Sequence, residues 1–274
     1  MLSSVVSKLS THFPSSRRWV WRTAYNALNR HFIQLDWYFL NYGYASADPE
    51  YRPPSLETSD EPDRLFIQLY EAALGNFPVE GLNILEVGCG RGGGSSYVAR
   101  CRKPRRMLGV DRSGQAVAFC IGHHQAPNLT FRLDDAEALS IPDGSFDVVL
   151  NVESSHCYAS MRRFVAEVTR VLKPGGHFAW ADFRNRSNVA EVEAAFGACG
   201  LQQVDWKDIT PGVLQALDEI HERKRKAIEQ AVPKLFIPLL QEFAAIKGSR
   251  IYEDFFHGEK VYLLGRYRKP LPKN

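Results

Sequence analysis

An apolar strand that runs directly into a glycine-rich turn is the feature that most constrains the fold of this chain. The segment 84–95 reads ILEVGCGRGGGS and places Gly88, Gly90 and Gly92 behind the apolar run. Glycine allows a sharp backbone turn and lets a ligand approach where a side chain would collide. A strand, a glycine-rich turn and a helix in this order are typical of nucleotide-binding sheets. The segment therefore predicts an α/β fold with a ligand at this edge of the sheet.

Short apolar segments alternate with helical patterns from residue 83 onward, which predicts a Rossmann-like, doubly wound sheet. Seven strands are expected, at 83–87, 106–110, 129–133, 146–150, 177–183, 202–208 and 260–268. Helical patterns are expected at 62–76, 95–103, 113–125, 160–172 and 188–199.

Together with the sheet, the segments before and after it divide the chain into four regions. We expect an N-terminal helical arm at 1–60, the core at 61–210, a helical lid insertion at 211–250, and the last strand with the tail at 251–274. In the lid, spaced residues from Val213 to Ala231 that include Lys224 trace an amphipathic helix, and a second helix is expected at 235–247. The basic run 223–226 is expected to be a solvated helix face, with contact to an acidic substrate or a membrane as the alternative. An insertion of this size is expected to form a lid or a dimer surface.

Composition excludes several classes of protein. The 34 basic and 31 acidic residues leave a net charge of +3, unlike the strongly basic domains that bind nucleic acid. No apolar run is long enough for a transmembrane helix. The five cysteines form no Cys-x-x-Cys pair, which favours a reducing compartment, such as the cytoplasm, and no metal site. Residues 1–35 carry basic side chains and no acid, so the arm is expected to be a packed cap, with a transit peptide or a membrane-surface helix as alternatives.

Acidic residues follow the first three predicted strands. Glu86 lies at the end of the first strand, where a carboxylate would repel a pyrophosphate but suit a ligand with an ammonium group. Asp111 ends the second strand, where doubly wound folds present a carboxylate to ribose hydroxyls. Asp134 and Asp135 follow the third strand, where an adenine edge would lie. These positions disfavour a nicotinamide oxidoreductase.

This ordered series resembles the class I S-adenosylmethionine-dependent methyltransferases over about residues 60–210. The matching segments are E-x-G-C-G-x-G, V-D, D-A-E-x-L-x-x-P-D-x-S-F-D-V-V and V-L-K-P-G-G. The resemblance implies that S-adenosylmethionine binds with its methionine part beside Gly88–Gly92. It further implies that Asp111 holds the ribose and that Asp135 and Ala136 contact the adenine. Asn151 would lie under the sulfonium.

Further segments refine the resemblance. Tyr42, in the motif Asn41-Tyr42-Gly43-Tyr44, is similar to an aromatic element that closes over the cofactor; Glu86 and Arg112 complete the expected cofactor-binding residues. The segments 59–62, 92–94 and 151–158 resemble the mycobacterial phthiotriolone and phenolphthiotriolone dimycocerosate methyltransferases, which O-methylate a hydroxyl on a long polyketide lipid. This resemblance implies a hydrophobic, hydroxylated acceptor, and the aromatic residues of the arm favour the same interpretation.

Methyl transfer to an aliphatic hydroxyl requires removal of a proton, for which histidine is the usual base. His156 follows the fourth strand and is the expected general base. Asp182, at the end of the fifth strand, is expected to orient His156 or to bind the hydroxyl, and Glu153 is a third catalytic candidate. A structural role is the alternative for His156 and Asp182, and facing the cofactor or the arm is the alternative for Glu153. C- or N-methylation of a small molecule and a catalytically inactive cofactor-binding protein also remain open, and metal-independent catalysis and a homodimer are further expectations.

Overall fold

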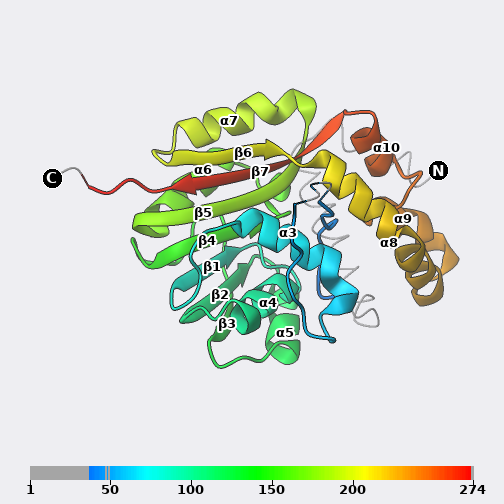
Figure 1. Ribbon diagram of the computed structural model, residues 1–274, viewed down its shortest axis with the longest axis horizontal. Helices are drawn as coiled ribbons and strands as arrows, with labels where there is room; N and C mark the ends of the chain where they lie inside the picture. Colours follow the sequence, from blue (N-terminus) through cyan, green and yellow to red (C-terminus); the bar gives the residue numbers. More distant parts are fainter. Residues whose placement is uncertain (1–36, 47, 49, 273–274) are drawn as a thin grey trace.

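The computed structural model describes residues 37–46, 48 and 50–272. Its centre is a seven-stranded sheet with the order β3-β2-β1-β4-β5-β7-β6 (Figure 1). The strands are β1 (Asn83–Val87), β2 (Arg106–Asp111), β3 (Leu129–Leu133), β4 (Phe146–Val152), β5 (Leu172–Asn185), β6 (Gln202–Asp208) and β7 (Lys260–Arg268). The doubly wound, seven-stranded α/β prediction is confirmed.

The strand order reverses between β1 and β4, because β2 and β3 continue to one side and β5 to the other. The pairings of β1 with β2, β2 with β3, β1 with β4 and β4 with β5 are all parallel. Only β7 runs against its neighbours, β5 and β6. Ligands of open α/β sheets bind at the carboxyl ends of the strands beside such a reversal. The turn after β1 and the end of β4 therefore form the expected site.

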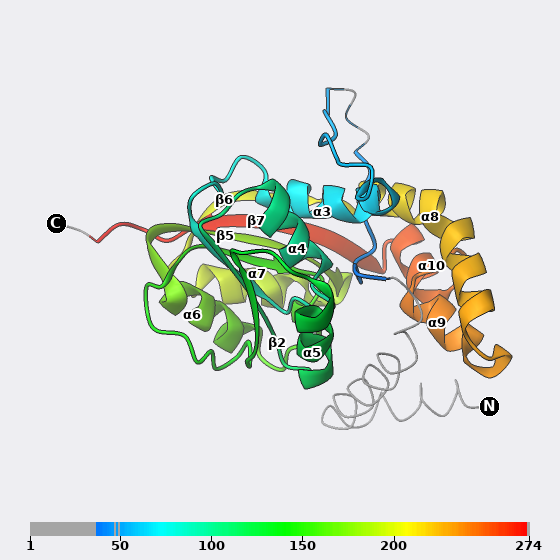
Figure 2. The same cartoon turned by 90° about the horizontal axis from the view of Figure 1, so that it is seen from below.

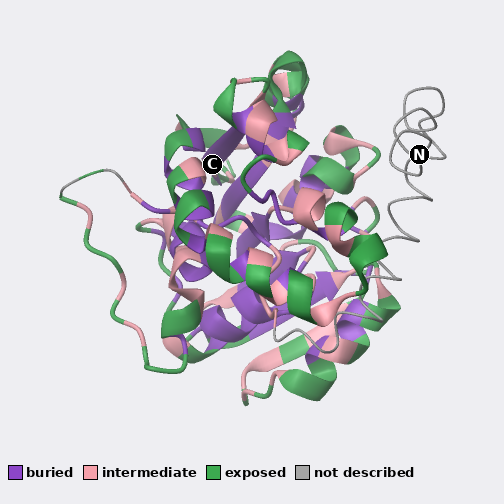
Figure 3. Ribbon diagram, turned by 90° about the vertical axis from the view of Figure 1, so that its right-hand side faces the viewer, coloured by how far each residue is buried: buried purple, intermediate pink, exposed green. Residues whose placement is uncertain are grey.

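Both faces of the sheet are covered, which explains the continuous apolar runs of the central strands. Ile84 packs with α3 (Arg64–Leu74) and α4 (Gly93–Cys101), whereas Leu85 packs with α6 (Met161–Val171) and α7 (Val189–Gly197). Figure 2 shows α3 and α6 on opposite sides of the sheet, and buried residues concentrate along the strands and the inner helix faces (Figure 3). The helix α5 (Gly114–His123) packs against β2 and β3. Short 3₁₀ turns complete the core: η2 (Glu61–Asp63), η3 (Ser155–Cys157) and η4 (Arg186–Asn188).

The lid is helical, as predicted, but its elements differ from those expected. The long helix α8 (Thr210–Ala231) is followed by the turn η5 (Lys234–Phe236) and by α9 (Ile237–Phe243), which ends before 247 because Ala245 adopts a φ of 50°. A further helix, α10 (Arg250–Phe256), precedes β7 and was not predicted. The hydroxyl of Ser249 caps α10 by accepting a hydrogen bond from Tyr252 N. The region 251–274 thus begins with a helix as well as containing the last strand.

The described part of the N-terminal arm contains no helix, so the helical prediction is wrong for residues 37–46, 48 and 50–60. Its backbone instead bonds to three separate elements. The carbonyl of Tyr38 accepts from Gly93 N (3.1 Å), and Tyr44 N donates to Leu65 O (2.9 Å). Ala45 N donates to Gly212 O of α8 (2.9 Å). Because these partners belong to three helices that are far apart in sequence, long-range contacts and not a local helical pattern fix this segment. The predicted helix of residues 1–36 lies outside the described residues.

Candidate active site

The turn after β1 is fastened to the end of β2. Asp111 accepts hydrogen bonds from Gly90 N (2.9 Å) and from Ser113 N (2.8 Å). Gly88 has a φ of +77°, and a Cβ there would overlap the Ser154 hydroxyl, so only glycine fits. Burial raises the pKa of Asp111. The fold thus brings Asp111 and the glycines together, as the sequence predicted.

Glu86 lies in a buried polar cluster beneath this turn. Its side chain is fully buried and accepts hydrogen bonds from the Tyr70 hydroxyl (2.7 Å) and from the Ser95 hydroxyl. These contacts join β1 to α3 and α4. Burial raises the pKa of Glu86 to about 7. Because both carboxylate oxygens bind protein hydroxyls, the structure places Glu86 as a support of the turn, and a contact with a ligand ammonium stays a prediction.

Asn151 occupies the point where the strand order reverses. Its amide nitrogen donates to Val87 O (2.8 Å) and to Ser154 Oγ (2.7 Å). The other side-chain atom, Oδ1, is buried and has no hydrogen-bond partner among the described residues. A buried acceptor without a donor costs free energy unless a ligand supplies one. Asn151 therefore marks a place for a bound group.

The predicted adenine side is more open. Arg112 Nε lies 3.8 Å from Asp135 Oδ2, and these side chains are 61% and 42% exposed, whereas Ala136 is buried. The neighbouring Asp134 is buried and accepts from Ser140 N (3.0 Å) and Arg132 (2.6 Å). Burial opposes the charge on Asp134, but these hydrogen bonds outweigh it and lower its pKa. Of the two adjacent aspartates, only Asp135 remains accessible to a ligand.

His156 and Asp182 form a hydrogen-bonded pair across the ends of β4 and β5. His156 Nδ1 lies 2.8 Å from Asp182 Oδ1, and His156 N donates to Asp182 Oδ2 at 2.8 Å. The imidazole stacks on Phe183 with 4.2 Å between ring centroids. Asp182 is fully buried, whereas 27% of the His156 side chain is exposed. The contact through Nδ1 leaves Nε2 as the ring nitrogen that can exchange a proton with a bound molecule.

A buried network, absent from the sequence prediction, holds this pair. The Asp182 carboxylate accepts from Ser155 Oγ (2.6 Å) and lies 3.1 Å from Arg184 Nη1. Ser155 Oγ in turn accepts from Trp180 Nε1 (2.9 Å). Burial would raise the pKa of Asp182, but Arg184 and His156 hold it far below its usual range. Burial likewise opposes a charge on His156, but Cys157 and Asp182 outweigh it and raise its pKa well above its ordinary value.

Glu153 connects this region to the N-terminal arm. Its Oε2 accepts from Tyr42 N and from the Tyr262 hydroxyl, each at 2.8 Å. Burial raises the pKa of Glu153 to about 8. Its φ of 50° is unusual for a residue with a side chain and typical of functional sites. The Tyr42 ring stacks on Phe183 at 5.6 Å, so the arm lies directly against the ring that supports the histidine.

Two further findings concern the described residues as a whole. They contain no group of three or more His, Cys, Asp and Glu side chains arranged to hold a metal ion. Within the same part of the chain, no helix is long and apolar enough to cross a membrane.

Comparison with known proteins agrees with this geometry. Residues 85–180 match the model of a methyltransferase domain. Over 255 residues the chain is 36% identical to the phthiotriol/phenolphthiotriol dimycocerosates methyltransferase of Mycobacterium tuberculosis, covering 93% of this chain and 94% of that protein. The chain belongs to this methyltransferase family. It is also 36% identical to the fatty-acid O-methyltransferase of Mycolicibacterium smegmatis, with 91% of this chain and 89% of that protein covered.

This methyltransferase also shares its fold with solved structures. The geranyl diphosphate C-methyltransferase of Streptomyces coelicolor, in complex with Mg²⁺, geranyl diphosphate and S-adenosyl-L-homocysteine, superimposes with a TM-score of 0.61 at 18% identity. The comparison covers 89% of this chain and 98% of that one. The prediction that the chain is an enzyme that uses S-adenosylmethionine is confirmed. The buried Asn151 Oδ1 without a donor and the carboxylate of Asp111 fit a cationic ligand with hydroxyl groups.

Several residues of this methyltransferase site were not found from the sequence. Ser155 and Arg184 buttress Asp182, and Tyr262 holds Glu153. Ser155 lies within the segment 151–158 that also contains His156, but no spacing rule links it to Asp182, a strand residue far away in sequence. Lys224, within the basic run expected to be a solvated helix face, is buried, in agreement with its place in the amphipathic pattern of Val213–Ala231.

Proposed function

We propose that this methyltransferase transfers the methyl group of S-adenosylmethionine to an oxygen of a lipid-like acceptor, a hydroxyl, with His156 as the general base. The observation that carries the proposal is the His156–Asp182 pair, 2.8 Å between Nδ1 and Oδ1, at the sheet edge next to Asn151. The names of the two relatives, one acting on phthiotriol lipids and one on fatty acids, support a long hydrophobic acceptor.

In the proposed reaction, Asp182, His156 and Glu153 have different roles. Asp182 accepts from Nδ1 and so directs Nε2 of His156 toward the acceptor hydroxyl, whose proton Nε2 removes as the oxygen attacks. Bound S-adenosylmethionine supplies an electrophilic methyl group, so alignment and proton removal are what the protein adds. Because the pKa of His156 is raised, its neutral, basic form becomes abundant only at a higher pH than for an ordinary histidine. Glu153 keeps the arm in place over the site through Tyr42.

The proposed binding residues for the methyl donor surround the reversal of strand order. Asn151 would lie beside its sulfonium, and Asp111 would accept hydrogen bonds from the ribose. The other members of this set are Tyr42, Glu86, Gly88, Gly90, Gly92, Arg112, Asp135 and Ala136.

Methylation of a carboxylate is a second candidate, favoured by the raised pKa of His156. An imidazolium cannot take up a proton, but it can bind a carboxylate oxygen, and a carboxylate needs no base before it attacks a methyl group. The pH profile separates the two reactions, because proton removal from a hydroxyl requires neutral His156 whereas carboxylate binding requires the charged form.

Calorimetric titration with S-adenosylmethionine, S-adenosylhomocysteine and NAD tests the cofactor assignment. We expect binding of the first two and none of NAD, with weaker binding in Asp111→Asn but not in Asp143→Asn, an exposed carboxylate paired with Arg170. Decan-1-ol and decanoate then serve as acceptors, with mass analysis distinguishing ether from ester. Wild-type affinity in Asp111→Asn would refute the ribose role, and cofactor binding with no ether or ester product from either acceptor would refute O-methylation of these acceptors.

We further propose a reducing compartment such as the cytoplasm, because all five cysteines are free thiols. Contact of the basic arm with a membrane involves residues outside the described ones and stays a prediction, as does a homodimer. The absence of nucleic acid among the partners rests on the nearly balanced charge of +3.

A further inference from the structure

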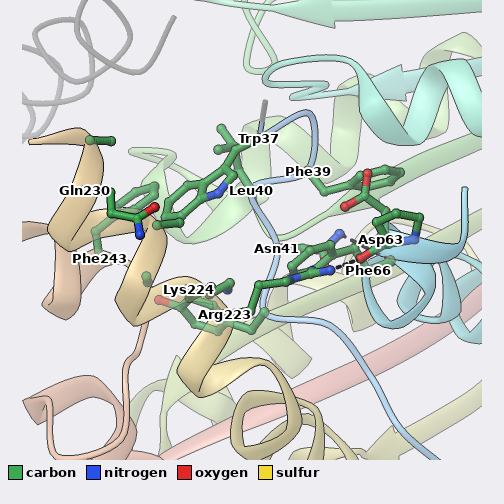
Figure 4. Close-up of a pocket in the computed structure, with 15 residues that line it drawn as sticks. Trp37, Phe39, Leu40, Asn41, Asp63, Phe66, Arg223, Lys224, Gln230 and Phe243 are labelled. Atoms are coloured by element: carbon green, nitrogen blue, oxygen red, sulfur yellow. Dashed lines mark hydrogen bonds between the residues drawn. The ribbon is translucent and has the colours of Figure 1, made fainter. Parts of the chain in front are cut away.

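A pocket of about 550 Å³ opens between the N-terminal arm and the lid. Aromatic side chains line much of it: Trp37 and Phe39 come from the arm, Phe66 from α3, and Phe243 from α9. Figure 4 shows these rings around a space that α8 closes with Arg223 and Lys224. The lining is thus largely apolar, with positive charge on one wall.

Lys224 is the unusual member of this wall. It is only 8% exposed, although its neighbours Arg223 and Arg225 are accessible. Its Nζ lies 5.0 Å from the centroid of the Phe66 ring and 5.9 Å from that of Tyr42. No carboxylate of the described residues forms an ion pair with it, and no described side chain accepts a hydrogen bond from it. Aromatic faces attract a cation but replace only part of its lost hydration.

The charged groups nearest to Lys224 also have hydrogen-bond partners of their own. Glu153 acts on it electrostatically, but Glu153 Oε2 accepts from Tyr42 N and Tyr262 OH. Arg223 donates to the carbonyl of Pro62 and interacts electrostatically with Asp63 at the pocket rim. Lys224 therefore retains the capacity to bind an anion inside a pocket whose lining is mainly apolar, with Asn41, Asp63, Arg223 and Gln230 as its other polar members.

We propose that Lys224 binds the anionic group of an amphiphilic ligand whose hydrocarbon chain lies against the aromatic rings of this pocket. A carboxylate on a long acyl chain has this chemistry. The inference deepens the proposed function, because it gives the lipid-like acceptor an acidic group. Tyr42 connects the two regions, since its ring faces Lys224 Nζ at 5.9 Å and stacks on Phe183, which in turn supports His156.

Protonation of Lys224 gives an independent prediction. Burial lowers the pKa of Lys224 to about 8, with Glu153 opposing this shift and Arg223 adding to it. A bound carboxylate would raise the pKa again, because it favours the charged form. At about pH 8.5, where the free site is largely neutral, binding of an anion is therefore accompanied by proton uptake, whereas binding of an alcohol is not.

The test compares decanoate with decan-1-ol, which share a chain length and differ in charge, by calorimetry on the full-length protein. We expect wild type to bind decanoate more tightly than decan-1-ol. Lys224→Met should weaken decanoate about ten-fold and leave decan-1-ol unchanged, whereas Lys224→Arg should retain most of the preference. Lys226→Met, an exposed lysine on the same helix, should change neither.

Binding of S-adenosylmethionine reports whether each variant is folded. If Lys224→Met does not fold, Lys224→Gln takes its place, with the same expected loss of affinity for decanoate and none for decan-1-ol. Equal affinity of wild type for the two ligands, or equal losses for both in Lys224→Met, would overturn the proposal. Methylation of decan-1-ol without selective binding of decanoate would refute this inference while supporting the proposed function.

Discussion

Replacing Asp182 by asparagine tests the catalytic pair most directly. The carboxylate is fully buried and accepts four hydrogen bonds, from Ser155 Oγ, His156 N, His156 Nδ1 and its own neighbour Phe183 N, at 2.6 to 2.8 Å. It also lies 3.1 Å from Arg184 Nη1. Asparagine keeps the shape but has one accepting oxygen and no charge. One pair of donors would then face an amide NH₂, and Arg184 would lose its counter-ion.

The magnitude follows from these contacts. Removing one partner of a buried ion pair destabilises a protein by about 3–5 kcal/mol. Here His156 is partly exposed and Ser155 Oγ can still accept from Arg184 Nη2 (2.7 Å), so we expect a loss of about 2–3 kcal/mol. Loss of a correctly oriented general base lowers kcat by about 10²–10⁴. For a hydroxyl acceptor we therefore expect kcat of Asp182→Asn to fall at least about 100-fold, with little change in acceptor KM.

The assay measures formation of S-adenosylhomocysteine with decan-1-ol as acceptor, alongside urea unfolding and calorimetric binding of the cofactor. Asp147→Asn is the matched control, because Asp147 also accepts from a backbone amide (Asn83 N, 2.9 Å) and pairs with a cation (Lys173, 2.7 Å), but at the opposite end of β4. The control should lose stability and keep kcat. A kcat for Asp182→Asn within about three-fold of wild type, in a protein that binds cofactor, would refute the role of the pair.

Three other predictions follow from the site. The pKa of Glu86 is raised to about 7, so ionisation of its carboxyl group destabilises the fold as the pH rises from about 4.5 through 7. The melting temperature of Glu86→Gln should therefore decline less over this range than that of wild type. Equal declines in the two proteins would contradict this prediction. Gly88→Ala should abolish cofactor binding, because an added Cβ would overlap neighbouring side chains. Gly81 has a similar positive φ, but an added Cβ there would meet no other atom, so Gly81→Ala should only lower the free energy of unfolding by about 1 kcal/mol. Equal cofactor binding by the two variants would contradict the steric argument. Because the pKa of His156 is raised on folding, its protonation contributes stability that is fully present below about pH 6.5 and is lost at higher pH. The difference in melting temperature between wild type and His156→Gln should therefore shrink as the pH rises. A difference that stays constant with pH would count against this prediction.

The sequence predicted the site best where its residues lie at or just after the carboxyl end of a strand. The bounds of β1 and the place of Asp111 follow from apolar runs and the glycines behind them, because parallel strands present their carboxyl ends at one edge. The proximity of His156 and Asp182 follows from the same rule, since β4 and β5 are adjacent and parallel. Their supporting contacts with Arg184 and Ser155 depend on side-chain directions that strand patterns do not contain.

The parts that could not be predicted depend on long-range contacts. Residues 37–46 form no helix; their backbone instead bonds to α3, α4 and α8, and no local sequence pattern reports such partners. The helix α10, Arg250–Phe256, is too short for a clear period. Lys224 lies on the apolar face of α8, as its spacing indicated, while Arg225 pairs with Glu222 and Glu229 on the solvated face. The basic composition of residues 223–226 predicted a solvated Lys224, whereas its helical spacing with apolar residues predicted a buried one. The prediction from the spacing was correct.

Hydroxyl and carboxylate acceptors make opposite demands on His156, which must be neutral for the first and charged for the second. In the structure without ligands, Asp182 favours the charged form. A cationic methyl donor placed beside Asn151 would oppose that charge and shift His156 toward the neutral form, whereas an acceptor carboxylate would restore it. The protonation of His156 in the complete complex thus depends on the acceptor itself. A pH profile of kcat that rises with decan-1-ol and falls with decanoate would show that one histidine serves both chemistries; two identical profiles would show that His156 is not the group that titrates.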